Sequence, residues 1–175
     1  AMGRGLMPEA MSLRLQTGEL PTIYADRRQL EQALLNLLAN ARDALPGEGE
    51  VVMRTALVDL GAEFCSTRPW ARPGSYVQIT VRDQGCGIPP AAREHVYEPF
   101  YTTKGFGQGT GLGLATVYAV CKRHKGYVDF ESELDVGTSF HLFLPVALAT
   151  TESPRPEPHA AAIPHGSGEL VMVVD

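Results

Sequence analysis

The chain has 175 residues, of which 44% are hydrophobic and 20% are charged, so it can bury the core of one ordinary domain. Its net charge of −5 argues against the basic footprint of a protein held to nucleic acid, and we expect no nucleic-acid partner. No apolar run is long enough to span a bilayer, and the three widely spaced cysteines form no CxxC pair. This pattern is typical of a reducing compartment, so we expect a cytoplasmic domain, whether the full protein is membrane-anchored or soluble.

The first predicted elements are two short strands followed by a long amphipathic helix. Ser12 to Leu15 and Pro21 to Tyr24 have strand composition, and Thr17-Gly18-Glu19 predicts a turn between them. Asp26 is a predicted helix N-cap, and Pro46-Gly47 predicts the end of the helix. The apolar residues between these signals recur at helical spacing on one face: Leu30, Ala33, Leu34, Leu37, Leu38, Ala41 and Leu45.

The middle of the chain is predicted to alternate strands with loops. Val51 to Leu60 and Tyr76 to Asp83 have strand composition and are joined by a loop. Pro89-Pro90 predicts the start of a short helix over Ala91 to Val96. The polar, glycine-rich stretch from Tyr101 to Gly109 is too poor in apolar residues to belong to a core.

A second helix and a hairpin complete the predicted domain. Thr110 is a predicted cap for a helix over Gly111 to His124, after which Tyr127 to Glu133 and Thr138 to Leu144 are predicted to pair around Asp135-Val136-Gly137. Together the elements predict an α+β fold over residues 10–146. We expect a two-layer sandwich in which a mixed, mostly antiparallel sheet carries about three helices on one face.

Beyond the predicted domain the composition changes. Residues 147–168 are rich in proline, alanine, serine, glutamate and histidine, and they predict a mobile linker. Residues 169–175 have the pattern of a buried strand that ends at Asp175.

The run Gly107-Gln108-Gly109-Thr110-Gly111-Leu112-Gly113-Leu114 is the first candidate binding motif. Glycines at alternate positions let the backbone approach a ligand closely, and the following helix offers free N–H groups and a positive dipole end, which favours phosphate. A flexible turn before a helix has the same composition, so both interpretations stay open for the run alone. A loop rather than a strand precedes it, which excludes a dinucleotide-binding fingerprint.

Three polar positions are further candidates. Asn36 and Asn40 lie four residues apart, hence on one face of the first helix, and their carboxamide oxygens can ligate Mg²⁺ or meet a phosphate. Asp83 ends a strand just before Gly85 and Gly87, where it can accept a hydrogen bond from an exocyclic amine beside room for a flat ring. The alternatives are polar boundary positions for the asparagines and an Asx turn for the aspartate.

Lys104 follows the sequence Pro99-Phe100-Tyr101-Thr102-Thr103, immediately before the glycine run. Its ammonium group is positioned to reach a terminal phosphate as a mobile point charge. An ordinary surface lysine is the alternative interpretation.

In this order, the four motifs resemble those of the sensor histidine kinases. Leu35 to Ala41 resembles the N box of that family, Asp83 to Gly87 the G1 box, Glu98 to Lys104 the F box and Gly107 to Leu114 the G2 box. Gly137 to Pro145 is also similar to the family's ending. The resemblance implies the Bergerat fold, shared with gyrase, Hsp90 and MutL ATPases, with ATP and Mg²⁺ as ligands.

The resemblance also implies roles for individual residues. Asp83 would hold the adenine amino group with help from Thr138, Asn40 would be the metal ligand, and Asn36 and Lys104 would serve catalysis on the phosphate side. The loop from Tyr101 to Gly109 would be the ATP lid. The implied nucleotide-binding residues are Asn36, Asn40, Asp83, Gly85, Gly87, Ile88, Tyr101, Lys104, Gly109, Thr110, Gly111, Leu112, Gly113, Leu114 and Thr138.

Asn36 bears on the reaction. Related ATPases carry a glutamate one helical turn before the Mg²⁺ asparagine, where it activates water, whereas an asparagine cannot act as a general base. We therefore expect a protein histidine kinase that donates the γ-phosphoryl group to a histidine on an upstream dimerisation domain in two-component signal transduction. A non-catalytic ATP-sensing module and a Bergerat-fold ATPase are the alternatives.

Two positions depart from the family's usual pattern. Asp43 stands where many histidine kinases have a basic residue, so we expect it to order the site rather than to touch phosphate, with Arg42 as a candidate for the missing charge. His124-Lys125-Gly126 replaces a more usual His-Gly-Gly, which should alter a turn and little else.

The sequence lacks one part of such a kinase. No phospho-accepting histidine motif precedes residue 20, so we expect that this chain binds Mg-ATP but cannot autophosphorylate alone. The acceptor would lie upstream in a parent protein that we expect to be a homodimer. Residues 169–175 resemble the first strand of a receiver domain, which predicts a hybrid kinase that passes its phosphoryl group to a receiver domain or response regulator.

Overall fold

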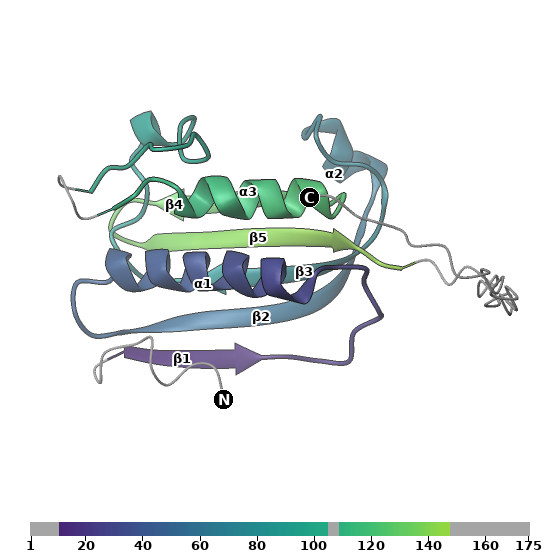
Figure 1. Cartoon of the computed structure of the whole chain (residues 1–175), viewed down its shortest axis with the longest axis horizontal. Coiled ribbons are helices and arrows are strands. Elements are labelled where there is room, and N and C mark those ends of the chain that lie inside the picture. The colour runs from purple at the N-terminus through teal and green to yellow at the C-terminus, as the bar shows by residue number, and fades with distance from the viewer. Residues whose placement is uncertain (1–10, 105–108, 148–175) are drawn as a thin grey trace, which may run out of the picture.

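Two helices lie side by side across one face of a five-stranded sheet in the computed structural model, which describes residues 11–104 and 109–147 (Figure 1). The strands are β1 (Met11–Gln16), β2 (Gly49–Leu60), β3 (Gly74–Arg82), β4 (Tyr127–Glu133) and β5 (Gly137–Pro145). The helices are α1 (Arg27–Ala44), α2 (Ala62–Ser66) and α3 (Gly113–Arg123), with a 3₁₀ turn at Pro90–Ala92. The predicted α+β sandwich with three helices is confirmed, although only α1 and α3 form the helical layer, because Phe64 of α2 packs in a separate cluster with Phe143.

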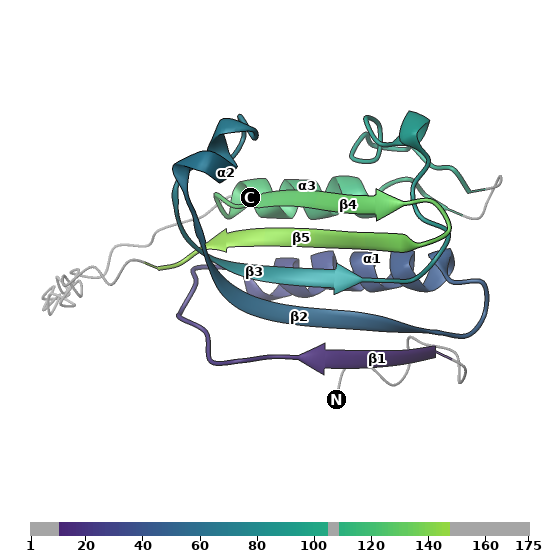
Figure 2. The same ribbon diagram turned by 180° about the vertical axis from the view of Figure 1, so that it is seen from behind.

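The strand order is β1-β2-β3-β5-β4, with β1 and β2 parallel and all other neighbours antiparallel. Helix α1 connects the two parallel strands by crossing one face of the sheet, and Figure 2 shows the uncrossed side of the same sheet. The predicted mixed, mostly antiparallel sheet is therefore confirmed. Its central strand, β3, ends at Arg82, so the chain leaves the sheet at Asp83.

Helix α1 starts where the sequence predicts. The Oδ1 atom of Asp26 accepts hydrogen bonds from the backbone N–H groups of Arg28 at 2.8 Å and Gln29 at 3.2 Å. The backbone N–H of Asp26 donates to Nε2 of His124, at 2.9 Å, which ties the start of α1 to the end of α3. The apolar face is also confirmed, since its members Ala33, Leu37, Leu38, Ala41 and Leu45 are buried.

Helix α3 starts later than predicted, and Thr110 is not its N-cap. The N-cap is Leu112, whose backbone N–H donates to Oγ1 of Thr110 at 3.3 Å. Gly111 cannot be helical because its φ is +65°. A Cβ at this position would collide with the backbone of Phe100, whose N–H donates to the Gly111 carbonyl at 2.9 Å. The close approach of the Phe100 segment therefore determines where α3 begins.

The core lies between the helical layer and the sheet. Leu37 of α1, Val117 and Cys121 of α3, and Val51 and Leu142 of the sheet are at most 1% exposed. Burying the Cys121 thiol raises its pKa to about 12, so this cysteine is a core residue rather than a reactive one.

A smaller aromatic cluster packs on the opposite face of the sheet. Side chains alternate along β5, so Phe143 points away from the neighbouring Leu142 and contacts this second cluster. The cluster also contains Leu60, Tyr76, Tyr127, Phe64 and Trp70. Phe64 belongs to α2, a helix in a segment that the sequence predicts to be a loop. Helix α2 has only five residues, which is too few for its apolar residues to show a helical period in the sequence.

Two further predictions of secondary structure are wrong. Pro21 to Tyr24 is not a strand, because only Ile23 forms an isolated bridge, with Val146, and β1 pairs with β2 instead of turning back on itself. Pro21 has no N–H group to donate to a ladder. The predicted helix over Ala91 to Val96 is a 3₁₀ turn at Pro90–Ala92 followed by further turns.

The predicted hairpin around residues 135–137 is confirmed by the antiparallel pairing of β4 with β5. The predicted linker beyond Ala147 and the strand over residues 169–175 lie outside the described residues. Within the described ranges, no helix combines the length and apolar character needed to cross a membrane.

Candidate functional site

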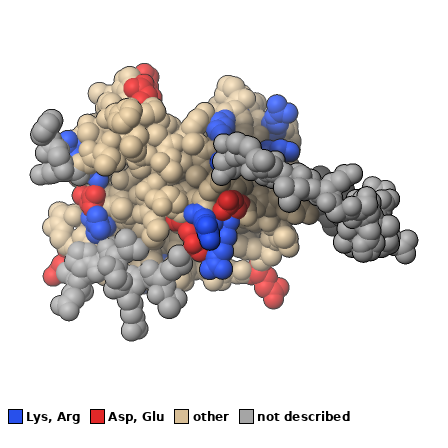
Figure 3. Space-filling model, viewed as in Figure 1, with Lys and Arg blue, Asp and Glu red and all other residues tan. Residues whose placement is uncertain are grey.

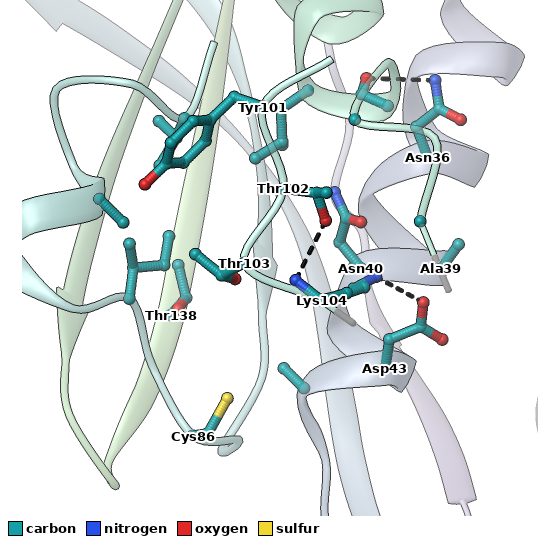
Figure 4. Close-up of a pocket in the computed structure, with 18 of the residues that line it drawn as sticks. Asn36, Ala39, Asn40, Asp43, Cys86, Tyr101, Thr102, Thr103, Lys104 and Thr138 are labelled. Carbon is teal, nitrogen blue, oxygen red and sulfur yellow. Dashed lines mark hydrogen bonds and ion pairs between the residues drawn. The ribbon is translucent and has the colours of Figure 1, made fainter. Parts of the chain in front are cut away.

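A cavity of about 470 Å³ opens between α1, the loop after β3 and the start of α3 (Figure 4). Figure 4 shows Asn36, Asn40 and Asp43 along one side on α1, Thr138 and Cys86 on the other side, and Lys104 between them. The four sequence motifs therefore converge on one site, although they are spread over most of the domain.

Asp83 forms the buried end of the cavity and is 5% exposed. Its Oδ1 accepts hydrogen bonds from the backbone N–H groups of Gly85 at 2.9 Å and Thr138 at 3.2 Å. Its own N–H donates to the Thr138 carbonyl at 2.9 Å. Among the described residues these bonds occupy only Oδ1, so Oδ2 is available to a donor on a ligand.

The electrostatics of Asp83 match this geometry. Burial raises its pKa above the usual value for an aspartate, although the N–H groups of Gly85 and Thr138 work in the opposite direction. A carboxylate in such a place is costly until a ligand donates to its second oxygen. The arrangement therefore suits a neutral donor on a flat ring, such as an exocyclic amine.

Asn36 and Asn40 line the same wall of the cavity, one turn apart on α1. The Nδ2 of Asn36 donates to the Gly113 carbonyl at 3.3 Å, and Gln32 donates to Oδ1 of Asn36 at 3.4 Å. Asn36 therefore links α1 to the first turn of α3. Asn40 makes no side-chain hydrogen bond within the described part of the chain, so its carboxamide is the freer of the two to meet a ligand.

The start of α3 faces the cavity. Gly109, Thr110, Gly111, Gly113 and Leu114 line it, and no side chain caps the first turn of the helix. The backbone N–H groups of this turn and the positive end of the helix dipole are thus directed at whatever the cavity binds. This is the arrangement in which helices bind phosphate.

Lys104 extends across the cavity towards α1 (Figure 4). Its Nζ lies 2.6 Å from Oδ2 of Asp43, and Nη2 of Arg42 lies 2.8 Å from the other oxygen, Oδ1. Burial opposes ionisation of Asp43, but the hydrogen bonds from Lys104 and Arg42 outweigh it and lower the pKa of this carboxyl. Asp43 thus orders a basic side chain at the site.

Most of the predicted binding residues line the cavity, and the exceptions are Gly85 and Leu112. Gly85 packs against the end of α1, where a Cβ would collide with the Ala44 carbonyl, and it acts on the site through its hydrogen bond to Asp83. Leu112 is the N-cap of α3 and is 41% exposed.

The cavity also includes residues that sequence reasoning did not assign to binding: Ala39, Asp43, Ala44, Cys86, Pro89, Ala92, Val96, Thr102, Thr103 and Phe140. Phe140 could have been predicted from the sequence, because it lies two residues after Thr138 on one strand and hence on the same face. No sequence pattern predicts the positions of Ala92 and Val96, since they reach the cavity through irregular turns.

Acidic and basic side chains are interspersed on the helical face of the molecule, as Figure 3 shows. Along α1, Arg27 pairs with Glu31 at 2.8 Å, and Arg42 pairs with Asp43 at 2.8 Å. Phosphates at this site would therefore be held by local groups rather than by a general positive field.

Comparison with known proteins identifies the family. The model described as "Histidine kinase-, DNA gyrase B-, and HSP90-like ATPase" matches residues 25–148. The chain is 39% identical over 142 residues to the "Sensor kinase CckA" of Brucella abortus, a match that covers 80% of this chain. The chain spans only 15% of the length of that relative.

Solved structures show the same fold. The "Mycobacterial sensor histidine kinase MprB" matches with a TM-score of 0.62 and 28% identity, covering 78% of this chain and 82% of that one. Full-length ShkA in complex with AMPPNP matches with a TM-score of 0.63 and 31% identity, covering 79% of this chain and 26% of that one. The chain therefore belongs to the histidine kinase-, DNA gyrase B- and HSP90-like ATPase family, as a sensor histidine kinase ATP-binding domain.

Proposed function

We propose that the cavity binds Mg-ATP and that the domain donates the γ-phosphoryl group to a histidine of an upstream dimerisation domain, in two-component signal transduction. The similarity to sensor kinases supports this reaction class, and the ShkA structure contains the nucleotide analogue AMPPNP. The groups that line the cavity support one orientation of the nucleotide.

The adenine ring is proposed to lie at the Asp83 end. Oδ2 of Asp83 would accept a hydrogen bond from the exocyclic amine, while the neighbouring Thr138 is itself 5% exposed and tied to Asp83 by backbone hydrogen bonds. Ile88 and Tyr101 also line the cavity and offer apolar surface to a flat ring.

The phosphates are proposed to lie between α1 and the start of α3. The backbone N–H groups of the segment from Gly109 to Gly113 would hold them, as at other helix N-termini. Lys104 supplies the mobile positive charge for the terminal phosphate.

Asn40 is proposed as the protein ligand of Mg²⁺. No group of three or more His, Cys, Asp or Glu side chains in the described ranges has the geometry of a metal site. Mg²⁺ usually keeps several waters and takes few protein oxygens beside substrate phosphates, so one free carboxamide on the cavity wall fits it. When bound, the ion supplies charge neutralisation at the phosphate oxygens.

The observation that favours phosphoryl transfer over hydrolysis is the pairing of the carboxylates in the cavity. The two aspartates that line it are Asp43, paired with Lys104 and Arg42, and Asp83, held by backbone N–H groups at the opposite end. Asn36 occupies the position one turn before Asn40, and a carboxamide is not a base. The unpaired Oδ2 of Asp83 lies at the proposed adenine end, so the described lining offers no free carboxylate on the proposed phosphate side to activate water.

The partners of the proposed kinase are an upstream dimerisation and phosphoacceptor domain of the same protein and a receiver domain or response regulator. We propose a homodimeric parent protein and a cytoplasmic domain. The three cysteines are free, which supports a reducing environment.

Calorimetric titration with AMPPNP and Mg²⁺ tests the binding site. We expect the wild type to bind and Asp83→Asn to lose affinity, because the asparagine presents a donor where the adenine amine also donates. Asp135→Asn, on the exposed hairpin turn, is the matched control and should bind like the wild type. No binding by the wild type would refute the proposed function, and unchanged affinity in Asp83→Asn would refute the adenine assignment.

Incubation with radiolabelled ATP tests the reaction. The chain alone should show neither stable phosphohistidine nor steady phosphate release. Phosphohistidine on the isolated chain would contradict an upstream acceptor, and steady release would favour an ATPase.

A further inference from the structure

Lys104 and Asp43 form an ion pair across the cavity that joins segments 61 residues apart in the chain. The atoms Nζ and Oδ2 are 2.6 Å apart, and the two side chains are 33% and 30% exposed. Such a distance is typical of a short, charge-assisted hydrogen bond. Because the pair is only partly buried, water and other anions can reach it.

The two basic partners of Asp43 differ in how easily they leave. Arg42 is its neighbour on α1 and contacts Oδ1 through Nε at 2.9 Å and Nη2 at 2.8 Å. Lys104 contacts only Oδ2, through a point charge on a flexible stem, and it comes from a separate loop. Lys104 is therefore the partner that can be exchanged without disturbing α1.

A competing anion would meet Lys104 in the same cavity. The cavity is lined by Asn40, Asp43 and Lys104. The start of α3 also reaches the cavity, where Gly113 lies close to Asn36 and Asn40. A terminal phosphate bound there carries more negative charge than one carboxylate and offers more acceptor oxygens. A diphosphate, shorter by one phosphoryl group, reaches less far towards the pair.

We propose that Asp43 is a positioning residue that holds the Lys104 ammonium group until a nucleoside triphosphate takes it over. This inference rests on the proposed function, since it assigns a cost to binding of the third phosphate. The triphosphate has to break the ion pair, which offsets part of the binding free energy that it gains from contact with Lys104. The diphosphate leaves the ion pair intact. Asp43 therefore reduces the preference of the site for ATP over ADP, which eases exchange after transfer.

The ion pair can be tested without nucleotide by amine labelling. The sequence has three lysines, so limiting acetic anhydride followed by mass spectrometry compares Lys104 with Lys122 and Lys125 as internal references. We expect Asp43→Asn to label Lys104 about threefold faster and to leave the other two unchanged, as for the loss of a partly exposed ion pair. An unchanged Lys104 rate would overturn the proposal.

Calorimetry with AMPPNP and with ADP, both with Mg²⁺, tests the exchange. Lys104→Gln should lower affinity for AMPPNP about tenfold and for ADP less than about twofold. Asp43→Asn should raise the AMPPNP-to-ADP affinity ratio about threefold, and Asp43→Glu should restore the wild-type ratio. In the Lys104→Gln background, Asp43→Asn should leave the ratio unchanged.

Three results would overturn the inference. Equal losses for both nucleotides in Asp43→Asn would indicate a structural or metal-binding role for this carboxylate. A raised ratio that persists in the Lys104→Gln background would show that Asp43 acts on the triphosphate by a route other than the release of Lys104. If the wild type bound neither nucleotide, the proposed function and the exchange would both fail, and the labelling would then report the ion pair alone.

Discussion

The two ends of the cavity are held by different kinds of interaction. At the buried end, Asp83 is 5% exposed and is fixed by backbone N–H groups of Gly85 and Thr138. At the open end, Lys104 and Asp43 are each about a third exposed and are held by side chains alone.

This difference separates a preformed subsite from an adjustable one. The backbone around Asp83 is set by the register of the sheet, because Thr138 belongs to β5 and Asp83 directly follows β3. The groups at the open end come from a helix and a loop, and solvent screens their charges. In the proposed orientation, the end that would recognise the base is therefore rigid, while the contact with phosphate at the other end could be exchanged.

The largest expected effect is on the rigid end, through Gly137→Ala. Gly137 has a φ of +131°, and a Cβ there would collide with the Asp83 carbonyl. Strain and displacement together should lower the free energy of unfolding by about 3 kcal/mol, measured by urea denaturation. Gly18→Ala is the control, since its added Cβ meets nothing within 4 Å. Equal stability of the two variants would show that the Asp83 end is not rigid.

The next effect concerns how each end treats different nucleotides. Asp83→Asn should weaken the binding of ADP and of AMPPNP by the same factor of about thirty, because the lost hydrogen bond is made to the adenine ring that both nucleotides share. Calorimetric titration of both nucleotides measures the factor. A loss confined to AMPPNP would place Asp83 near the phosphates and reverse the proposed orientation.

A smaller effect distinguishes the two ends by ionic strength. Raising the salt from about 0.05 M to about 0.5 M should shrink the affinity difference between wild type and Lys104→Gln about threefold, because partly exposed charges are screened. The penalty of Asp83→Asn should stay constant over the same range, since this residue is buried. A salt-independent Lys104 effect would contradict an adjustable open end.

The smallest expected effect is on the way in which the stability of the folded chain depends on pH. The pKa of Asp83 is raised by burial, so the folded chain holds this proton more tightly than the unfolded chain, whose reference value is 3.8. The corresponding stability is fully present below that value and is lost as pH rises through the folded pKa. In thermal unfolding without nucleotide, the melting temperature of Asp83→Asn relative to that of the wild type should therefore be higher at neutral pH than at acid pH. A difference that does not vary with pH would contradict the effect of burial.

Local patterns were sufficient to predict much of the fold. The helical spacing of apolar residues identified the buried face of α1, and Asp26 gave its start. The turn at residues 135–137 identified the β4–β5 hairpin. Failures occurred where a distant segment intervenes: Phe100 delays the start of α3, and β2 rather than residues 21–24 pairs with β1.

By itself, the sequence determined which side chains carry the proposed chemistry, because the motifs name them by residue type and by spacing along single elements. Asn36 and Asn40 share a wall for that reason, and Asp83 follows a strand. Only the tertiary structure decided that Lys104 pairs with Asp43, that the backbone N–H of Thr138 donates to Asp83, and that Asn36 holds the first turn of α3. These contacts join segments that are distant in the chain, and no local pattern records the distance between them.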